Sequence, residues 1–572
     1  MRLPPLVLAL ATSLAAASCA STPNPTAQAT TQHAGGIIVE VPDIAHPAGE
    51  SAQWWFRNGA AQAAARGAMD GRARNVILFV GDGMSLTTVA AARILEGQRK
   101  GAPGEENSLS WENFPATALS RTYNTNSQTP DSAGTASAMT TGVKTRLGVL
   151  GIGQQAARGD CTQAKAAQLL TLWELAAASG LATGVVTTTS VTHATPGATY
   201  SHSADRNWES DANLSDAAKS SGCKDIARQL IEAPSGSGPE VVMGGGRSYF
   251  MPTGQHDPEY PDTLGKRNDG RDLIKEWQQR NPRGRYVWNA TQLAAAPTDQ
   301  ALLALFETTD MQYEHERPQD AAGEPSLAEM TRAAISRLSR NPQGFVLMVE
   351  GGRIDHAHHA GNAYRALDET IALSDAVRVA TEMTSESDTL ILVTADHSHT
   401  LTFTGYPQRG NPILGKVLGA SREGDAKESP GTLARDATGM PYTTLGYISG
   451  PGFAGATDQQ PEGAKFLRKR PTTFQPVTGG RHDLTDVDTE TPDYLQDALI
   501  PMRSEMHGGD DVGIWARGPG SSAVRGSVEQ NTIFHFLLQA TPRLRDALCA
   551  KGGCDANGVP VVLPTPAAFG FE

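Results

Sequence analysis

The sequence of 572 residues contains only one long apolar run, which lies at the N-terminus between Leu6 and Ala17. That run follows Arg2 and ends in small residues, which is typical of an export signal, and it is too short to span a membrane. No later segment approaches the roughly 18 apolar residues that a membrane helix needs. We therefore expect a signal peptide at residues 1–18, an exported protein and a soluble body.

The end of this signal predicts a second feature. Residues 16–19 read Ala-Ala-Ser-Cys, which is similar to a bacterial lipoprotein cleavage box with Ala16 in place of the usual Leu. Cys19 is then a candidate lipid anchor on a periplasmic or cell-envelope protein. Simple cleavage near Cys19 is the alternative.

Positive charge is not in excess. The chain has 48 basic and 61 acidic residues and a formal charge of −13. This balance disfavours nucleic acid as a partner and is compatible with bound divalent cations. With 39% hydrophobic residues, the chain is too apolar to be disordered and is long enough for a large core.

Cysteine is scarce, and no pair has the CxxC spacing of a metal site. Without Cys19, four cysteines remain, and three pairings are possible in an exported protein. Cys549 and Cys554 are close together in a polar tail, which favours a bridge between them and a second bridge between Cys161 and Cys223.

The chain has no internal repeat, and its organisation follows from its composition. Residues 19–50 are rich in Thr, Gln, Pro and Ala and are predicted to be a flexible tether. The folded body is predicted at 51–572, with a first helix at 51–70 and a crown-like surface insertion at about 400–505. Short apolar runs predict buried strands at 75–80, 182–188, 241–243, 345–349 and 389–394. Helical patterns lie at 87–98, 164–178, 326–339 and 364–383.

This alternation predicts an α/β fold of three layers, with a mostly parallel central sheet and helices on both faces. Ligands of such sheets bind beyond the carboxyl ends of the strands. Three predicted strands end in acids there. The residues delivered to this edge are Asp82, Glu350, Asp355, Asp396 and His397. Since clustered carboxylates repel one another, their concentration at one edge indicates bound metal.

Histidines near these acids indicate which metals fit. Asp355 and His359 are four residues apart and would share one face of a helix. Asp396 and His397 form a second acid and imidazole pair, a combination that suits zinc, whereas all-oxygen ligands suit magnesium. His507 is a further candidate ligand, although a lone histidine is more often structural.

A nucleophile candidate is Ser132, in Asp131-Ser132-Ala133-Gly134. Small residues after a serine indicate the first turn of a helix, whose free N–H groups bind phosphate. Plain helix capping by Asp131 or Ser132 is the alternative for this segment taken alone.

Seven segments together resemble the alkaline phosphatase family, between about Asn75 and Arg517. They are VGDGM at 80–84, DSAGTASAMTTGVKT at 131–145, VTTTSVTHATPGATYSH at 186–202, RNWESD at 206–211, VEGGRIDHAHHAGNA at 349–363, TADHSHT at 394–400 and MHGGDDVGIWARGP at 506–519.

The resemblance implies roles for individual residues. Ser132 would be the nucleophile, and Arg206 would bind the phosphate. One zinc would take Asp355, His359 and His507, and a second would take Asp82, Asp396 and His397. Magnesium would take Asp82, Thr195 and Glu350.

Two positions differ from the common bacterial pattern and resemble the animal branch. His193 stands where many bacterial members have Asp, which could favour zinc over magnesium in the third site, and His356 stands where they have Lys. The animal enzymes also bind calcium. The corresponding residues here are Glu259, Phe306 through its carbonyl, Glu307 and Glu324, with Glu in place of the family's Asp at the last position.

The resemblance implies hydrolysis of small phosphate monoesters through a phosphoserine, with a broad range of leaving groups, an alkaline pH optimum and a homodimeric enzyme. A phosphodiesterase of the same superfamily usually has Thr as nucleophile and lacks the arginine. A sulfatase would need a C/S-x-P-x-R context, which is absent around Ser132. A binding protein for phosphate or metal without turnover is the remaining alternative.

Overall fold

The computed structural model describes residues 36–233, 238–419, 431–436, 439–453, 465–466 and 481–571. The predicted signal peptide and Cys19 lie outside these ranges, as does the part of the predicted tether before residue 36. Residues 36–50 are described and form no helix or strand before α1 begins.

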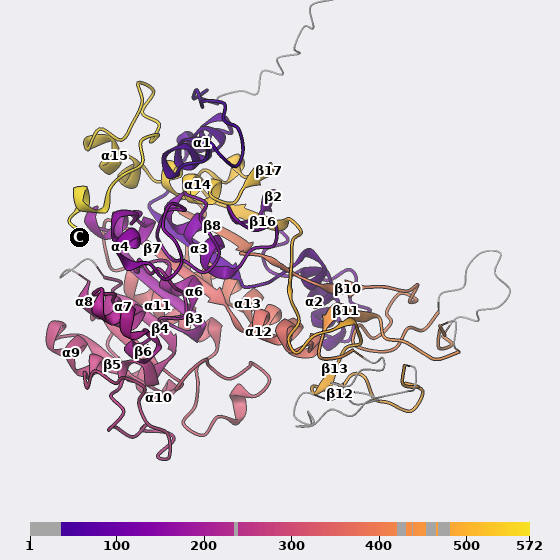
Figure 1. Cartoon of the computed structure of the whole chain (residues 1–572). Helices are drawn as coiled ribbons and strands as arrows, with labels where there is room; N and C mark the ends of the chain where they lie inside the picture. The colour runs from indigo at the N-terminus through magenta and orange to yellow at the C-terminus, as the bar shows by residue number, and fades with distance from the viewer. Residues whose placement is uncertain are drawn as a thin grey trace, which may run out of the picture. The chain divides into compact units, whose positions relative to one another are not determined.

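A ten-stranded sheet forms the centre of the fold (Figure 1). Only β16 runs antiparallel to its neighbours, so the sheet is mostly parallel, as predicted. In spatial order the strands are β17 (Gly526–Glu529), β2 (Ala116–Arg121), β16 (Val512–Arg517), β8 (Thr389–Ala395), β1 (Asn75–Gly81), β7 (Phe345–Gly351), β3 (Ala182–Ser190), β4 (Val241–Gly245), β6 (Leu302–Leu305) and β5 (Arg285–Val287).

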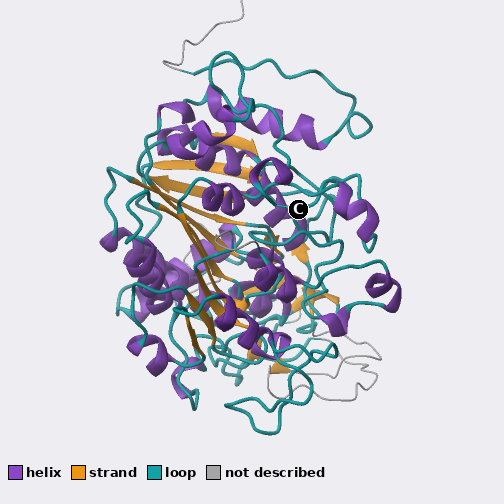
Figure 2. Cartoon of the chain, turned by 90° about the vertical axis from the view of Figure 1, so that its left-hand side faces the viewer, coloured by secondary structure: helices purple, strands orange, loops and turns teal. Residues whose placement is uncertain are grey.

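Helices cover both faces of this sheet, which confirms the three-layer α/β prediction (Figure 2). The α-helices of the described chain are α1 (Ala52–Ala65), α2 (Leu86–Arg99), α3 (Ser132–Thr141), α4 (Cys161–Ala166), α5 (Leu172–Ala178), α6 (Ala194–Gly197), α7 (Asp216–Ser220), α8 (Ile226–Glu232), α9 (Leu273–Arg280), α10 (Ala290–Ala295), α11 (Leu327–Leu338), α12 (Arg353–His359), α13 (Ala363–Met383), α14 (Thr532–Ala540) and α15 (Pro542–Ala550).

The central strand β1 shows how the layers are held together. All seven of its residues are buried, because alternate side chains enter different cores. Ile77 and Phe79 pack in the core that includes residues of α2, α11 and α13. Val76 and Leu78 pack in the opposite core with residues of α1, α5 and α14. Truncating a buried aromatic such as Phe79 to Ala would cost about 3–5 kcal/mol of stability.

One predicted helix is wrong in its extent. The pattern at 164–178 belongs to two helices, α4 and α5, because the chain leaves the helix after Ala166 and starts another one at Leu172. Thr171 caps the second helix in a reciprocal arrangement with Glu174, which satisfies free N–H groups at its start.

The segment predicted as a crown-like insertion contains a sheet of its own. The strands β10 (Leu401–Phe403), β11 (Leu445–Gly450) and β14 (Ala498–Pro501) pair with one another and not with the central sheet. A two-stranded sheet of β12 (Lys465–Phe466) and β13 (Tyr494–Leu495) accompanies them. The bounds of the insertion stay a prediction.

Two short strands close the ends of this segment. β9 (Ser398–His399) pairs antiparallel with β15 (His507–Gly508), with His399 opposite His507. Residues more than a hundred positions apart therefore lie side by side.

Both predicted disulfide bonds are present. Cys161 is bonded to Cys223, and Cys549 to Cys554. The first bridge ties α4 to the turn before α8, and the second closes the loop after α15.

Candidate metal centre and nucleophile

The acids at the carboxyl ends of β1, β7 and β8 meet because these strands are adjacent and parallel. In this register Val80 pairs with Glu350, and Gly81 pairs with Ala395. Asp82 and Asp396 are the residues that follow β1 and β8, so both lie at the same edge.

One candidate cluster consists of Asp82, Asp396 and His397. One ligand atom from each lies within 4.8 Å of the others, and all three side chains are buried. The His397 Nε2 atom is 3.3 Å from Asp82 Oδ1 and 3.4 Å from Asp396 Oδ2. Both carboxylate oxygens of Asp82 are buried without a hydrogen-bond donor in the described chain. A divalent cation would satisfy them.

A second cluster consists of Asp355, His359 and His507. The Asp355 Oδ1 atom is 3.3 Å from His359 Nε2 and 3.5 Å from His507 Nε2. The two imidazole nitrogens are themselves 3.1 Å apart. Asp355 and His359 lie on α12 at the predicted spacing of four residues, and the β9–β15 pair brings His507 to them.

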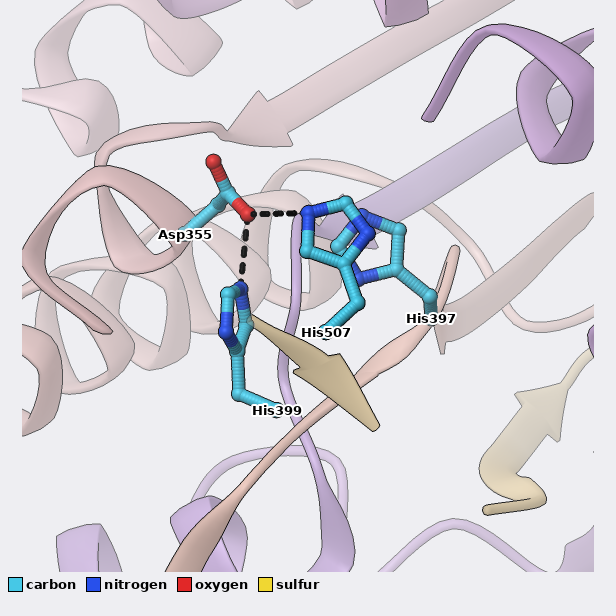
Figure 3. A group of neighbouring side chains, drawn as sticks. All are labelled: Asp355, His397, His399 and His507. Carbon is cyan, nitrogen blue, oxygen red and sulfur yellow. Dashed lines mark hydrogen bonds and ion pairs between the residues drawn. The ribbon is translucent and has the colours of Figure 1, made fainter. Parts of the chain in front are cut away.

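His399 lies in the same cluster but differs in its bonding (Figure 3). Its Nε2 is 2.6 Å from Asp355 Oδ1, and its Nδ1 is bonded to Glu505 Oε2. Although burial opposes it, these two carboxylates raise the pKa of His399 to about 10. A protonated imidazole has no lone pair for a metal. The contacts of both ring nitrogens with carboxylates therefore favour a role for His399 in orienting Asp355 over a role as a metal ligand.

Glu505 also acts on the neighbouring histidine. Its backbone carbonyl accepts a hydrogen bond from His359 Nδ1 at 2.6 Å, which leaves Nε2 to face Asp355. Its carboxylate accepts from the backbone N–H of Thr400 at 2.7 Å. The sequence analysis missed His399 and Glu505, although both are within two residues of predicted ligands.

A third cluster combines Glu350, Asp82 and His193. Glu350 Oε2 accepts hydrogen bonds from Thr187 and Thr189, whereas its Oε1 has no donor. His193 Nδ1 is also buried without a partner in the described chain, and the Thr195 hydroxyl lies close enough to the Glu350 carboxylate to lower its pKa. These unpartnered atoms fit the predicted ligands of a third ion.

The protonation behaviour of these acids reflects the crowding of negative charge. Burial raises the pKa of Asp82 well above its usual range, and neighbouring carboxylates, Asp396 foremost, add to this shift. Burial raises the pKa of Glu350 to about 7. Burial would raise that of Asp355 too, but facing histidines, His359 foremost, hold it well below its usual range. Cations in the clusters would keep all of these carboxylates ionised.

Ser132 is the first residue of α3 and lies against these clusters. Its Oγ is 3.2 Å from His397 Nε2, and the side chain is buried. Asp131 caps the helix by accepting a hydrogen bond from the Gly134 N–H at 3.1 Å. The predicted helix start is therefore present. Asp131 caps the helix, which leaves the Ser132 hydroxyl free of the capping role.

Arg206 is held between two partners. One guanidinium N–H donates to Asp131 Oδ2 at 3.3 Å, and another donates to His193 Nε2 at 3.0 Å. Burial, followed by the positive charge of Arg206, lowers the pKa of His193 to about 3, so this imidazole is neutral and can accept a hydrogen bond. Asp131 thus connects the start of α3 to the arginine.

The acids proposed for calcium form a separate group. Glu259, Glu307 and Asp320 approach within 4.8 Å through one oxygen each, and Asp320 was missed by the sequence analysis. Glu324 is buried nearby, and burial together with Glu307 raises its pKa to about 9. One oxygen each of Glu259 and Glu324 has no donor in the described chain. Phe306 directly precedes Glu307 after β6.

Comparison with known families shows the family to which the chain belongs. A sequence model of the alkaline phosphatase family matches residues 73–542. The chain belongs to this family.

Two animal alkaline phosphatases are close in sequence. The chain is 42% identical over 503 residues to the tissue-nonspecific alkaline phosphatase isozyme of Gallus gallus, covering 86% of this chain and 89% of that protein. It is 43% identical over 476 residues to the alkaline phosphatase of Gadus morhua, covering 82% and 92%. This relationship confirms the resemblance to the alkaline phosphatase family.

Two solved structures share the fold. The alkaline phosphatase of Thermus thermophilus superposes with a TM-score of 0.57 at 24% identity, covering 89% of this chain and all of that chain. The enzyme from the Antarctic bacterium TAB5 gives a TM-score of 0.51 at 21% identity, covering 82% and 98%. Both support the α/β architecture of the alkaline phosphatases.

Membership in this family makes the chain an alkaline phosphatase that hydrolyses phosphate monoesters. The family is metal-dependent, and the described residues contain clusters with the donor atoms that metals bind. The phosphodiesterase and binding-protein alternatives are not favoured.

Proposed function

We propose that this alkaline phosphatase hydrolyses small phosphate monoesters through a phosphoserine formed on Ser132. The observation that carries the proposal is the position of the Ser132 hydroxyl, 3.2 Å from His397 and at the N-terminus of α3. The helix terminus presents free N–H groups and a positive dipole end toward a phosphate.

The metal assignment proposed here has three parts. Asp355, His359 and His507 would hold one zinc. Asp82, Asp396 and His397 would hold a second. Mixed carboxylate and imidazole donors suit zinc, and the buried, unpartnered oxygens of Asp82 support a bound cation.

The third ion would take Asp82, Thr195 and Glu350. Oxygen donors favour magnesium, whereas the nearby His193 would favour zinc. When bound, such ions supply Lewis acidity toward the phosphoryl, attacking and leaving oxygens.

The protein residues have distinct tasks in the reaction. In the first displacement the Ser132 oxygen loses its proton to solvent and bonds to phosphorus, and the alkoxide leaving group departs and takes up a proton. Water then attacks the phosphoserine, which releases inorganic phosphate and restores the Ser132 hydroxyl. Arg206 donates two N–H groups to phosphate oxygens in a planar fork, and Asp131 orients that fork.

Two properties follow from this arrangement. The residues assigned above would act on the phosphoryl group, and none of them is assigned to the organic part of the leaving group, so we expect broad substrate tolerance. The Ser132 hydroxyl must lose its proton before it attacks, so we expect the rate to rise from neutral to alkaline pH.

Calcium is proposed at Glu259, Phe306, Glu307 and Glu324. Asp320 joins this proposal because one of its oxygens lies within 4.8 Å of one from Glu259 and one from Glu307. Hard oxygen donors of this kind suit calcium. The unpartnered oxygens of Glu259 and Glu324 support the proposal.

Export is proposed from the N-terminal signal, and two disulfide bonds support an oxidising compartment. Within the described ranges, no helix has the length and apolarity to cross a bilayer. A lipid anchor on Cys19, a periplasmic or cell-envelope location and a homodimer are further parts of the proposal.

The test is the initial rate on a chromogenic phosphate monoester between neutral and strongly alkaline pH. We expect the rate to rise with pH, to vanish on chelation and to return with zinc and magnesium. Ser132→Ala should lower kcat by roughly 10³-fold or more. Acid-quenched wild-type enzyme should carry phosphate on Ser132. Unchanged turnover in Ser132→Ala would overturn the nucleophile assignment.

A further inference from the structure

Glu209 lies three residues after Arg206 and has no role in the reaction described above. Its carboxylate faces the segment between β3 and α6. Glu209 Oε2 accepts one hydrogen bond from the Ser190 hydroxyl and another from the Thr192 hydroxyl, each at 2.6 Å. Glu209 is partly buried, and the Tyr249 hydroxyl is a further partner.

In the described chain the partners of the Glu209 carboxylate are hydroxyl groups, and no Lys or Arg forms an ion pair with it within 4.0 Å. Burial raises its pKa, and hydroxyl donors compensate for the lost solvation. Ser190 has a second acidic partner, since its backbone N–H donates to Asp310 Oδ1 at 2.9 Å. The segment that begins at Ser190 is therefore held from two sides.

The same two segments meet again at the candidate centre. His193 directly follows Thr192 and accepts the hydrogen bond from Arg206 at 3.0 Å. The segment with His193 and the segment with Arg206 are thus joined at two points, one through Glu209 and one through Arg206 itself.

The backbone around Glu209 is also anchored away from the centre. The Glu209 carbonyl accepts from the Ala227 N–H at 3.2 Å, and the Trp208 carbonyl accepts from the Ile226 N–H at 2.8 Å. Both donors belong to the start of α8. Glu209 therefore connects a firmly placed backbone to the hydroxyls beside His193.

We propose that Glu209 is a positioning residue that sets the placement of Arg206 relative to His193 for phosphate binding. This inference rests on the proposed role of Arg206 as the phosphate ligand. Without the Glu209 carboxylate, Ser190 and Thr192 lose a shared acceptor, and the segment with His193 can shift relative to Arg206. A misplacement of about 1 Å in a positioning group can cost up to about 10²-fold in activity.

The expected effect falls on phosphate affinity. Glu209→Ala should weaken the Kd of inorganic phosphate and raise KM by about tenfold, with a smaller change in kcat. Glu209→Gln retains an oxygen acceptor and should stay within about threefold of wild type. Thr192→Val and Ser190→Ala each remove one donor and should give intermediate values.

The experiment is a calorimetric titration of the metal-loaded enzyme with inorganic phosphate, made for Arg206→Ala, Glu209→Ala and the double variant. Metal content and Tm are measured on each protein. The matched control is Glu232→Gln on α8, a carboxylate that contacts Lys224, Arg228 and Arg271 and not the segment with His193. Its phosphate affinity should equal that of wild type.

The double variant separates the inference from the proposed function. If Glu209 acts through Arg206, its loss should add nothing in the Arg206→Ala background. Additive effects, or a Glu209→Ala enzyme with normal phosphate affinity, would overturn the inference and leave the role of Arg206 intact. Normal affinity in Arg206→Ala would overturn both. If Glu209→Ala does not fold, Thr192→Val replaces it in the same cycle with Arg206→Ala. Normal phosphate affinity in Thr192→Val, or additive effects in the double variant, would then overturn the inference.

Discussion

At the scale of single residues, Glu505 determines how two histidines face the candidate metal centre. Its carboxylate holds His399 against Asp355, and its carbonyl fixes the ring of His359. Partners behind metal ligands typically contribute about 10- to 100-fold to metal affinity.

We therefore expect Glu505→Ala to weaken zinc retention at Asp355, His359 and His507 by about 10-fold or more. Competition with a chromophoric chelator and metal analysis by mass spectrometry would measure this without reference to turnover. Glu382→Gln, which changes an exposed carboxylate on α13, is the control and should retain zinc normally. Wild-type zinc affinity in Glu505→Ala would show that Glu505 only fills space.

The ligands themselves could be predicted because each follows a strand or shares a helical turn in the sequence. A spacing of four residues was sufficient to predict Asp355 and His359 as ligands of one ion. Asp82 and Asp396 were predicted from the rule that parallel strands end at one edge of the sheet. Glu505 and Asp320 could not be found this way. Their partners come from distant segments, and their role depends on which side chain they face.

At the scale of elements, the segment from Glu259 to Glu324 has carboxylates that favour protons when no cation is present. Glu324 has its pKa raised to about 9 from a usual value near 4.5. The folded form then binds a proton that the unfolded chain releases. Stability from this proton is present at low pH and is lost as pH rises through about 9.

A calcium ion that replaces this proton should therefore stabilise the enzyme more at pH 9 than at pH 6. We expect Tm of the zinc- and magnesium-loaded protein to increase on calcium addition by roughly 2 °C or more at pH 9, and by less at pH 6. Scanning calorimetry with and without calcium measures the difference. Glu324→Gln should abolish most of the dependence on pH. An equal calcium effect at both pH values would contradict this account.

Elements were predicted best where burial is complete. β1, β3, β7 and β8 are buried on both faces and read as continuous apolar runs, so their existence was correctly predicted. β2 alternates buried and exposed residues, and β5 has only three residues. Neither strand therefore has a continuous apolar run in the sequence, and neither was predicted. The break between α4 and α5 depends on the cap that Thr171 forms at the start of α5. The helical pattern of the sequence continues through this position, so it did not predict the break.

At the scale of the whole molecule, the candidate metal clusters join strands that form the centre of the sheet. Glu350 lies in β7, and Asp82 and Asp396 directly follow β1 and β8. The charges of these three carboxylates repel one another when they share no cation. Ions that bind only the folded state stabilise it by mass action, by about 4 kcal/mol per site at a thousandfold excess over Kd.

Removal of the metals should accordingly lower Tm, and restoring zinc and magnesium should recover it in a concentration-dependent way. Calorimetry on chelated and reconstituted enzyme measures this. Asp82→Asn, which removes a charge shared by two clusters, should reduce both the metal response and the activity. A Tm that does not change on complete metal removal would show that the clusters are not occupied in the native enzyme.

The pairing of β9 with β15 has a consequence for how this enzyme can diverge. The two strands bring His399 and His507 together at the base of the segment between them. The β9–β15 pair therefore holds the two ends of this long segment together beside the candidate metal centre. The entropy of closing a loop grows only with the logarithm of its length, by about 0.6 kcal/mol per doubling. Insertions and deletions between the two strands therefore change the free energy of folding little. The surface of this segment can change in evolution while the candidate metal centre stays constant.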